Sequence, residues 1–283
     1  LAESTRSMPR LAWCTGIHLN FAKADALAEF LQHLDAADPD LLLIGGDIAE
    51  ATDVVHYLEL LDHHLQRPVF FVLGNHDFYF GSISRVRHDV RALCARQDRL
   101  VYLSDAGVIE LAAQVALVGH DGWADARIGD YARSQIMLND YRLIQELAGM
   151  DKQQRWPLLQ ALGDEAAAVI RQVLPQALER YASVYLLTHV PPLREACWHN
   201  GALSNDEWAP HFTCKAVGDA ILEILPDYPH RHLTVLCGHT HGSGEAHPLP
   251  NLCIYTGAAV YGFPAVDRVI TVGTAPASEP HPQ

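Results

Sequence analysis

Apolar segments that end abruptly in polar residues constrain the fold of this chain more than any other feature of its sequence. The clearest is Pro68–Asp77, in which the apolar run Val69–Leu73 is followed by Gly-Asn-His-Asp. A continuous run of β-branched and aromatic residues is typical of a parallel strand covered on both faces. The glycine permits a sharp turn, after which an amide, an imidazole and a carboxylate stand at the strand end. Taken alone, the segment is also compatible with an ordinary turn of the Asn-Gly type.

Four other segments repeat the pattern and favour a functional interpretation. In each, an apolar run is followed within a few residues by a histidine or an aspartate. They are Leu11–Thr15 before His18, Leu41–Ile44 before Asp47, Ser183–Thr188 before His189, and Leu233–Cys237 before His239 and His241. Because ligands bind at the carboxyl ends of strands in open α/β folds, we expect these side chains to meet at one site.

Helical periodicity between the strands indicates the fold class. Apolar residues recur at three- and four-residue spacing in Leu27–Leu34, Val54–Leu65 and Ser82–Arg96. Further strand-like runs follow, and we expect the first three to pair in one layer or to form an edge. They are Val101–Leu103, Val108–Leu111, Val115–Val118, Leu252–Thr256 and Val266–Val272. The sequence therefore predicts an α/β fold, a layered sandwich with helices outside two sheets.

The chain is long enough for one large domain, and we expect a single domain over residues 1–283. Between about residues 121 and 180 the pattern becomes helical, in Ile136–Leu147 and Ala161–Leu178, with a break at Trp156 and Pro157. We interpret this part as a helical insert or cap. From about residue 274 to 283 the sequence is rich in proline and small residues, which predicts a disordered tail.

Charge and composition limit the partners. The chain has 20 basic and 34 acidic residues and a formal charge of −14, which argues against a broad nucleic-acid-binding surface. Its six cysteines show no CxxC spacing, and we expect them to be reduced. The sequence has neither an apolar run of about 18 residues nor the apolar region of a signal peptide at its start, so we expect no membrane association and a cytoplasmic location.

The residue types at the strand ends indicate the kind of ligand. Imidazole, carboxylate and amide oxygen occur together without thiolate, a mixture that suits Mn²⁺, Fe or Zn²⁺ and fits neither a zinc finger nor a calcium loop. Any one of these histidines is more often a satisfied core or surface residue. It is improbable by chance that five predicted strands all end in side chains that can bind a metal ion.

With these blocks on one chain, the sequence resembles the calcineurin-like metallophosphoesterases, from about Leu11 to Val272. That family carries Asp-x-His, Gly-Asp, Gly-Asn-His-Asp/Glu, a lone histidine after a strand, and Gly-His-x-His. The corresponding blocks here are Gly16-Ile17-His18, Gly46-Asp47, Gly74-Asn75-His76-Asp77, Thr188-His189 and Gly238-His239-Thr240-His241. Four of the five match in full, and the first has Gly16 where the family has aspartate. The resemblance implies a four-layer α/β/β/α sandwich of two mixed sheets, with the active site at the strand C-terminal ends.

The resemblance also implies roles for the matching residues. Asp47 would bridge two divalent ions (Mn, Fe or Zn), one completed by Asn75, His189 and His239 and the other by His18 and His241. His76 would face the substrate, stabilising transition-state oxygens or protonating the leaving oxygen, and Asp77 would orient it. A hydroxide shared by the two ions would attack phosphorus. Because Gly16 cannot coordinate, we expect the site of His18 and His241 to be weakened or empty.

The expected activity is hydrolysis of a small phosphomonoester or phosphodiester. Among weaker candidates, His120 and its neighbour Asp121 could line the same rim. Arg127, Arg133 and Arg142 could hold a substrate phosphate, although a solvated helix face is the simpler explanation for each arginine taken alone. Two alternatives remain open at this point. One is a binding or regulatory protein that lost turnover through Gly16, and the other is a nuclease, which the charge disfavours. The sequence makes no prediction of oligomeric state.

Overall fold

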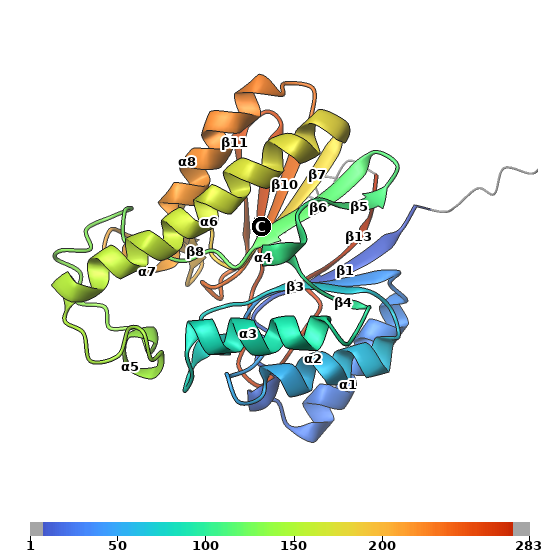
Figure 1. Cartoon of the computed structure of the whole chain (residues 1–283), viewed down its shortest axis with the longest axis horizontal. Coiled ribbons are helices and arrows are strands. Elements are labelled where there is room, and N and C mark those ends of the chain that lie inside the picture. The colour runs from blue at the N-terminus through green and yellow to red at the C-terminus, as the bar shows by residue number, and fades with distance from the viewer. Residues whose placement is uncertain (1–7, 274–283) are drawn as a thin grey trace, which may run out of the picture.

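The first of two mixed sheets carries the strands that precede His18, Asp47 and Asn75. The computed structural model describes residues 8–273, so the tail predicted from Thr274 lies outside the described residues. The order of this sheet is β13-β1-β2-β3-β4, with β13 antiparallel to β1 and the other neighbours parallel (Figure 1). The strands are β1 (Arg10–Cys14), β2 (Leu41–Gly45), β3 (Val69–Val72), β4 (Leu100–Tyr102) and β13 (Arg268–Thr271).

The second sheet carries the strands that precede the remaining histidines. Its order is β11-β12-β10-β7-β6-β5, in which the two edge strands are antiparallel to their neighbours and the inner strands are parallel. The strands are β5 (Ile109–Ala112), β6 (Val115–His120), β7 (Ser183–Thr188), β10 (His232–Cys237), β11 (Gly244–Leu249) and β12 (Leu252–Thr256). A separate small hairpin pairs β8 (Trp198–His199) with β9 (Ala202–Leu203).

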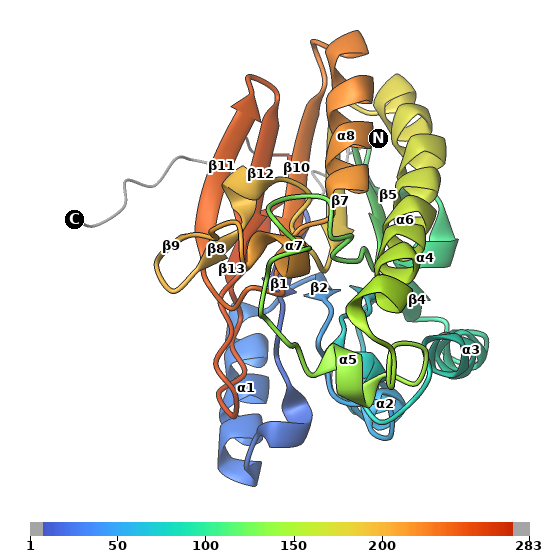
Figure 2. The same cartoon turned by 90° about the vertical axis from the view of Figure 1, so that its left-hand side faces the viewer.

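Helices cover the outer face of each sheet. Figure 1 shows α1 (Ala24–Ala37), α2 (Val54–Leu65) and α3 (Ile83–Cys94) beneath the first sheet. Figure 2 shows α6 (Lys152–Arg180) beside α8 (Lys215–Ile224) on the outer face of the second. The short helices are α4 (Leu103–Ala106), α5 (Asp140–Leu143) and α7 (Ala209–Phe212), with 3₁₀ turns η1 (Leu19–Phe21), η2 (His76–Phe78), η3 (Arg194–Ala196) and η4 (Leu225–Asp227). No helix within residues 8–273 is long and apolar enough to cross a membrane.

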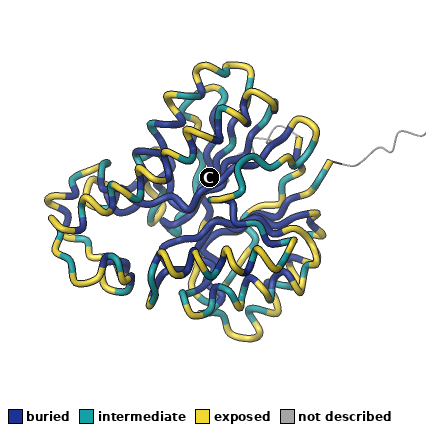
Figure 3. Tube along the Cα trace, viewed as in Figure 1, coloured by how far each residue is buried: buried dark blue, intermediate teal, exposed yellow. Residues whose placement is uncertain are grey.

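Three apolar clusters hold the four layers together. One lies between the first sheet and its helices, and a second between the second sheet and α6 and α8. The third fills the space between the sheets and includes Trp13, Phe70, Leu117, Leu187 and Tyr255. The strands are accordingly buried along their length, while exposed residues follow the outer sides of the helices (Figure 3). The predicted four-layer α/β/β/α sandwich is confirmed.

Two segments differ from the prediction. Of the three strand-like runs after residue 100, β4 and β5 form sheet edges as expected, but the three do not share a layer, because β4 belongs to the first sheet and β5 and β6 to the second. Trp156 and Pro157 do not break a helix, because α6 runs without interruption from Lys152 to Arg180. A capping box of Asp151 and Gln154 starts α6, and its packing against β6 and α8 makes it part of the outer layer. The rest of the predicted insert, residues 121–151, is mostly irregular and contains α5.

Candidate metal centre

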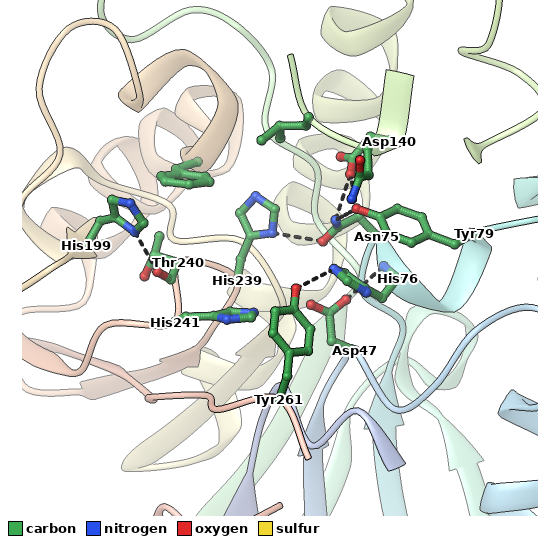
Figure 4. Close-up of a pocket in the computed structure, with 13 residues that line it drawn as sticks. Asp47, Asn75, His76, Tyr79, Asp140, His199, His239, Thr240, His241 and Tyr261 are labelled. Atoms are coloured by element: carbon green, nitrogen blue, oxygen red, sulfur yellow. Dashed lines mark hydrogen bonds between the residues drawn. The ribbon is translucent and has the colours of Figure 1, made fainter. Parts of the chain in front are cut away.

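The six predicted ligands come together at one end of the two sheets. His18, Asp47 and Asn75 stand on the loops after β1, β2 and β3 of the first sheet. His189 follows β7 of the second sheet, and His239 and His241 follow β10. Figure 4 shows several of these side chains around a common cleft. Each sheet therefore supplies three of the six candidate ligand residues.

The first donor group joins Asn75, His189 and His239. The Asn75 Oδ1 lies 3.1 Å from His189 Nε2 and 2.9 Å from His239 Nδ1, and the two imidazole nitrogens are 3.2 Å apart. Asp47 Oδ1 completes the group at 3.4 Å from His189 Nε2. Donor atoms of a tetrahedral site with bonds of about 2.1 Å are roughly 3.4 Å apart, so this group has the dimensions of a metal site.

The protonation of the two rings shows that a cation fits between them. His189 Nδ1 is 2.8 Å from the Gly45 carbonyl, and His239 Nε2 is 2.9 Å from the His211 carbonyl. A carbonyl can only accept, so each of these nitrogens carries the ring proton. The facing atoms His189 Nε2 and His239 Nδ1 then both present lone pairs, next to the amide oxygen of Asn75. Three acceptors about 3 Å apart repel one another unless a cation lies among them, and the carbonyl partners fix the ligating tautomers.

The second donor group contains His18, His241 and the other oxygen of Asp47. His18 Nε2 lies 3.2 Å from His241 Nε2 and 3.7 Å from Asp47 Oδ2. Asp47 thus directs Oδ1 to the first group and Oδ2 to the second. The Asp47 carboxylate therefore stands between the two donor groups, with one oxygen nearer to each.

The backbone at the site is held in an unusual conformation. Nine non-glycine residues of the described chain have positive φ, and four of them are His18, Asp47, His239 and His241. This backbone conformation costs about 1–3 kcal/mol of conformational free energy per residue. It persists only where the surrounding structure enforces it, typically at functional sites. The strain therefore coincides with the ligand positions.

Burial prepares these groups to bind a cation. Desolvation lowers the pKa of His189 and of His241 to about 4 and that of His239 to about 3, so these imidazoles are neutral near pH 7. Burial also lowers the pKa of His18. In the absence of an ion, desolvation raises the pKa of Asp47 to about 8. Neutral imidazoles are the ligating form, whereas the carboxyl of Asp47 must lose its proton when an ion binds.

Two residues that the sequence did not indicate orient the amide of Asn75. Asp140, in α5, accepts hydrogen bonds through Oδ1 from Asn75 Nδ2 at 2.8 Å and from the Tyr79 hydroxyl at 2.6 Å. Asn75 Nδ2 also lies 3.0 Å from that hydroxyl. With its amino group held this way, Asn75 turns its oxygen towards His189 and His239 (Figure 4). No sequence spacing links Asp140 to the five blocks, so only the fold shows its role.

His76 lies beside the donor groups at the wall of the cleft. Its Nε2 is 3.1 Å from the hydroxyl of Tyr261, and its ring packs on that of Tyr79 with 4.2 Å between ring centroids. Burial lowers the pKa of His76 to about 3, so its imidazole is neutral. Nitrogen or oxygen atoms of His18, Asp47 and His76 also lie within 4.8 Å of one another. Distance alone would therefore allow His76 to be a ligand as well as a substrate-facing group.

The role predicted for Asp77 needs correction. Its carboxylate accepts backbone hydrogen bonds from Ile48, Ala49 and Gly74, at 2.8, 2.9 and 2.8 Å, and its side chain is fully buried. No hydrogen bond joins Asp77 to His76 among the described residues. Asp77 therefore fastens the loop after β2 to the loop after β3, and Tyr261 is the hydrogen-bonding partner of His76.

The predicted substrate contacts of His120 and Arg127 also need correction. His120 Nδ1 accepts from the backbone of Gly122 at 3.1 Å, and Arg127 binds Asp125 at 3.0 Å and Asp164 at 2.8 Å. Neither residue lines the cleft within the described chain. Asp121, next to His120, is a buried acceptor of hydrogen bonds from Arg87, Tyr102 and Leu73. Through these bonds Asp121 links the end of β6 to Arg87 of α3 and to the residue after β3.

Gly16 lies at the position where the resemblance implies an aspartate. Its φ is +56°, and a Cβ built on it would lie 3.6 Å from His18 Nε2 but only 2.5 Å from the Cβ of Ala259. The loop between β12 and β13 thus occupies the space beside Gly16. A side chain at this position would point towards the second donor group only if the loop moved.

Comparison with known proteins agrees with this geometry. The family model of the calcineurin-like phosphoesterases matches residues 9–243. The fold and the site define a metallophosphoesterase, an enzyme that hydrolyses phosphoesters with divalent metal. The chain belongs to the calcineurin-like phosphoesterase family. A search of curated proteins gives no match.

Solved structures share the fold at low sequence identity. The phosphopantetheinyl hydrolase PptH from Mycobacterium tuberculosis aligns with a TM-score of 0.67 and 16% identity, covering 97% of this chain and 99% of that one. A dimetal phosphatase from Danio rerio aligns with a TM-score of 0.57 and 14% identity, over 90% and 89%. The TT1561 protein of Thermus thermophilus gives a TM-score of 0.53 and 11% identity, over 89% and 90%.

Proposed function

We propose that this protein holds two divalent ions, Mn, Fe or Zn, and hydrolyses a small phosphomonoester or phosphodiester. The single observation that carries the proposal is the division of the Asp47 carboxylate between two groups of donors. Asn75, His189 and His239 would hold one ion, and His18 and His241 the other. Two adjacent ions supply a nucleophilic water of lowered pKa and neutralise charge on the phosphoryl oxygens.

The chain's own groups would carry the rest of the reaction. The oxygen of water bonds to phosphorus, the bond from phosphorus to the ester oxygen breaks, and the leaving alcohol takes up a proton. His76 stands at the wall of the cleft, where its neutral ring can donate a hydrogen bond to an oxygen of the transition state. Tyr261 and Tyr79 hold that ring between them. General acid–base or hydrogen-bonding groups of this kind contribute about 10²–10⁴-fold to the rate.

The cleft supports a small substrate. Its volume is about 210 Å³, and no lysine or arginine is among the described residues that line it. A groove that follows a nucleic-acid backbone needs many cationic contacts. The nuclease alternative is therefore disfavoured both by the net charge of −14 and by the local charge of the cleft.

Metal content and hydrolysis of a generic aryl phosphate and its aryl diester test the proposal together. We expect close to two equivalents of metal at saturation and turnover of at least one ester. The variant His239→Ala should lose metal from the Asn75 site, because its ligand set is otherwise intact. An unchanged metal-to-protein ratio in that variant would contradict the ligand assignment.

The variant His76→Gln separates the substrate-facing role from the ligand role. It should slow turnover about 10²–10⁴-fold while the metal content stays that of the wild type. Loss of metal instead would make His76 a ligand. Full metal occupancy in the wild type without hydrolysis of either ester would favour a binding or regulatory protein, the alternative that Gly16 suggests.

A further inference from the structure

A second hollow adjoins the metal-facing cleft on the other side of His76. It has a volume of about 510 Å³ and is lined by Phe21, Glu50, His76, Tyr79, Phe80, Asn139, Leu143 and Tyr261. We call it the aromatic hollow. Four of its lining residues, His76, Tyr79, Asn139 and Tyr261, also line the cleft. The two spaces therefore meet at His76, so one ligand can occupy both.

Exposed aromatic rings form the walls of the aromatic hollow. The exposed fractions of Phe21, Phe80 and Tyr261 are 46%, 63% and 47%, high values for side chains of this kind. The rings of Phe21 and Tyr261 meet edge to face, with 5.2 Å between centroids. Phe80 has a φ of +61°, and its N–H bonds to the Leu143 carbonyl at 2.9 Å. A bulky residue in this strained conformation, with its ring exposed at a hollow, is more consistent with binding than with packing.

The charge of the aromatic hollow is negative. Among the described residues that line it or the cleft there is no lysine or arginine. Glu50 lines the hollow and is half-buried, and its carboxyl group has no hydrogen-bonding or ion-pair partner within the described chain. Burial and the nearby Asp53 raise the pKa of Glu50, so a bound cation would stabilise its charged form.

We propose that the aromatic hollow binds the leaving group of the substrate and that this leaving group is an apolar group bearing a positive charge, such as an alkylammonium. The proposal rests on the proposed function, because His76 then separates the phosphoryl group in the cleft from the leaving group in the hollow. Aromatic faces attract cations through their quadrupoles, and Glu50 adds a formal charge. An anionic leaving group would meet Glu50 in the aromatic hollow, with no lysine or arginine among the described lining residues to pair with it.

Three matched phenyl phosphates test the chemistry of the aromatic hollow. Each carries a para ethylene spacer ending in trimethylammonium, in tert-butyl or in carboxylate, so that the phenols have similar acidity and the esters similar intrinsic reactivity. On the metal-loaded protein, kcat/KM should fall in that order. We expect the cation to exceed the tert-butyl isostere by about 3–30-fold, the range of an aromatic and carboxylate site for a cation.

Variants assign the effect to named side chains. Glu50→Gln should reduce the cation-to-isostere ratio, and Phe80→Ala should raise KM for both of these substrates. Glu29→Gln and Phe263→Ala are the matched controls, since both residues are exposed and line neither space, and they should leave the ratio unchanged. Calorimetric binding of the trimethylammonium phenol, the product of its ester, should weaken in Glu50→Gln but not in Glu29→Gln.

The outcomes separate this inference from the proposed function. Hydrolysis of all three esters with equal kcat/KM would overturn the inference and leave the proposed function standing. Failure of the metal-loaded protein to hydrolyse any of the three esters or the aryl diester would overturn the proposed function, while the phenol titration would still report on the aromatic hollow. A preference for the cation that survives in Glu50→Gln, or an unchanged KM in Phe80→Ala, would also overturn the inference.

Discussion

Gly16 and Ala259 lie together where the family pattern calls for a carboxylate ligand. Gly16→Asp would place a Cβ 2.5 Å from that of Ala259. It would also put a side chain on a backbone whose φ is +56°, a conformation that residues other than glycine rarely adopt. We expect the single variant to be destabilised by about 1–3 kcal/mol, as is typical of overpacking. Thermal unfolding measures this loss.

The double variant Gly16→Asp with Ala259→Gly removes the clash and tests whether position 16 can ligate. Its stability should recover in part, since the positive φ of position 16 remains, and metal affinity at the site of His18 and His241 should exceed that of Ala259→Gly alone, most visibly at limiting metal. Equal metal affinity in the two proteins would show that position 16 is no ligand position in this chain.

Asp47 makes metal binding depend on pH. Its pKa of about 8 in the metal-free protein means that at pH 7 the carboxyl is about nine-tenths protonated, and an ion must displace that proton. The pKa values of His189, His239 and His241, at about 3–4, lie too low to contribute protons in this range. Metal affinity should therefore rise as pH increases from 6 to 8 and level off above it. Calorimetry in buffers of different ionisation enthalpy should detect about one proton released at pH 7 and almost none at pH 9.5.

At the scale of single residues, the sequence was informative where a ligand directly follows a strand. The structure brings all six candidate ligands together, because each is tied to its strand by a short loop whose glycine or turn is visible in the sequence. Asp77 was misread because a carboxylate next to a histidine in sequence need not face it in space. Asp140 and Tyr261 were not predicted, since each reaches the site from a distant segment and carries no local signal.

Helix α5 is a short element whose main contribution to the site is Asp140. Asp140→Ala should free the Asn75 amide to rotate and lower metal affinity at the Asn75 site by about 10–100-fold, the usual cost of losing a group that orients a ligand. Metal titration of the purified protein measures this affinity. Asp105→Ala is a suitable control, because Asp105 pairs with Arg91 on the surface. An affinity equal to that of the control would show that Tyr79 alone orients the amide.

At the scale of elements, strands were predicted more accurately than the connections between them. The runs in Val54–Leu65, Ser183–Thr188 and Leu252–Thr256 coincide with α2, β7 and β12, because continuous apolar runs and helical spacing depend on local sequence. Strand β11 was missed because an edge strand containing Glu245, His247 and Pro248 lacks an apolar run. The division of β4 and β6 between two sheets depends on tertiary packing, which spacing does not encode.

For the whole molecule, bound ions should raise stability, because their ligands come from both sheets. Removing metal with a chelator leaves facing lone pairs and strained backbone at His18, Asp47, His239 and His241 without a cation. At a free metal concentration of about 100 times the dissociation constant, one ion adds about 2.7 kcal/mol. In a protein of this size we expect the melting temperature to fall by several degrees on chelation. Differential scanning calorimetry with and without added Mn²⁺ or Zn²⁺ tests this, and identical curves would contradict it.

The division of ligands between the sheets also sets when the site can form during synthesis. The candidate ligands of the first sheet have been made once Asn75 is complete, but each donor group also needs a residue that follows β10, His239 for one and His241 for the other. A nascent chain that has not yet released β10 from the ribosome therefore lacks a complete site for either ion. Metal uptake should therefore follow the synthesis of β10 and the docking of the two sheets.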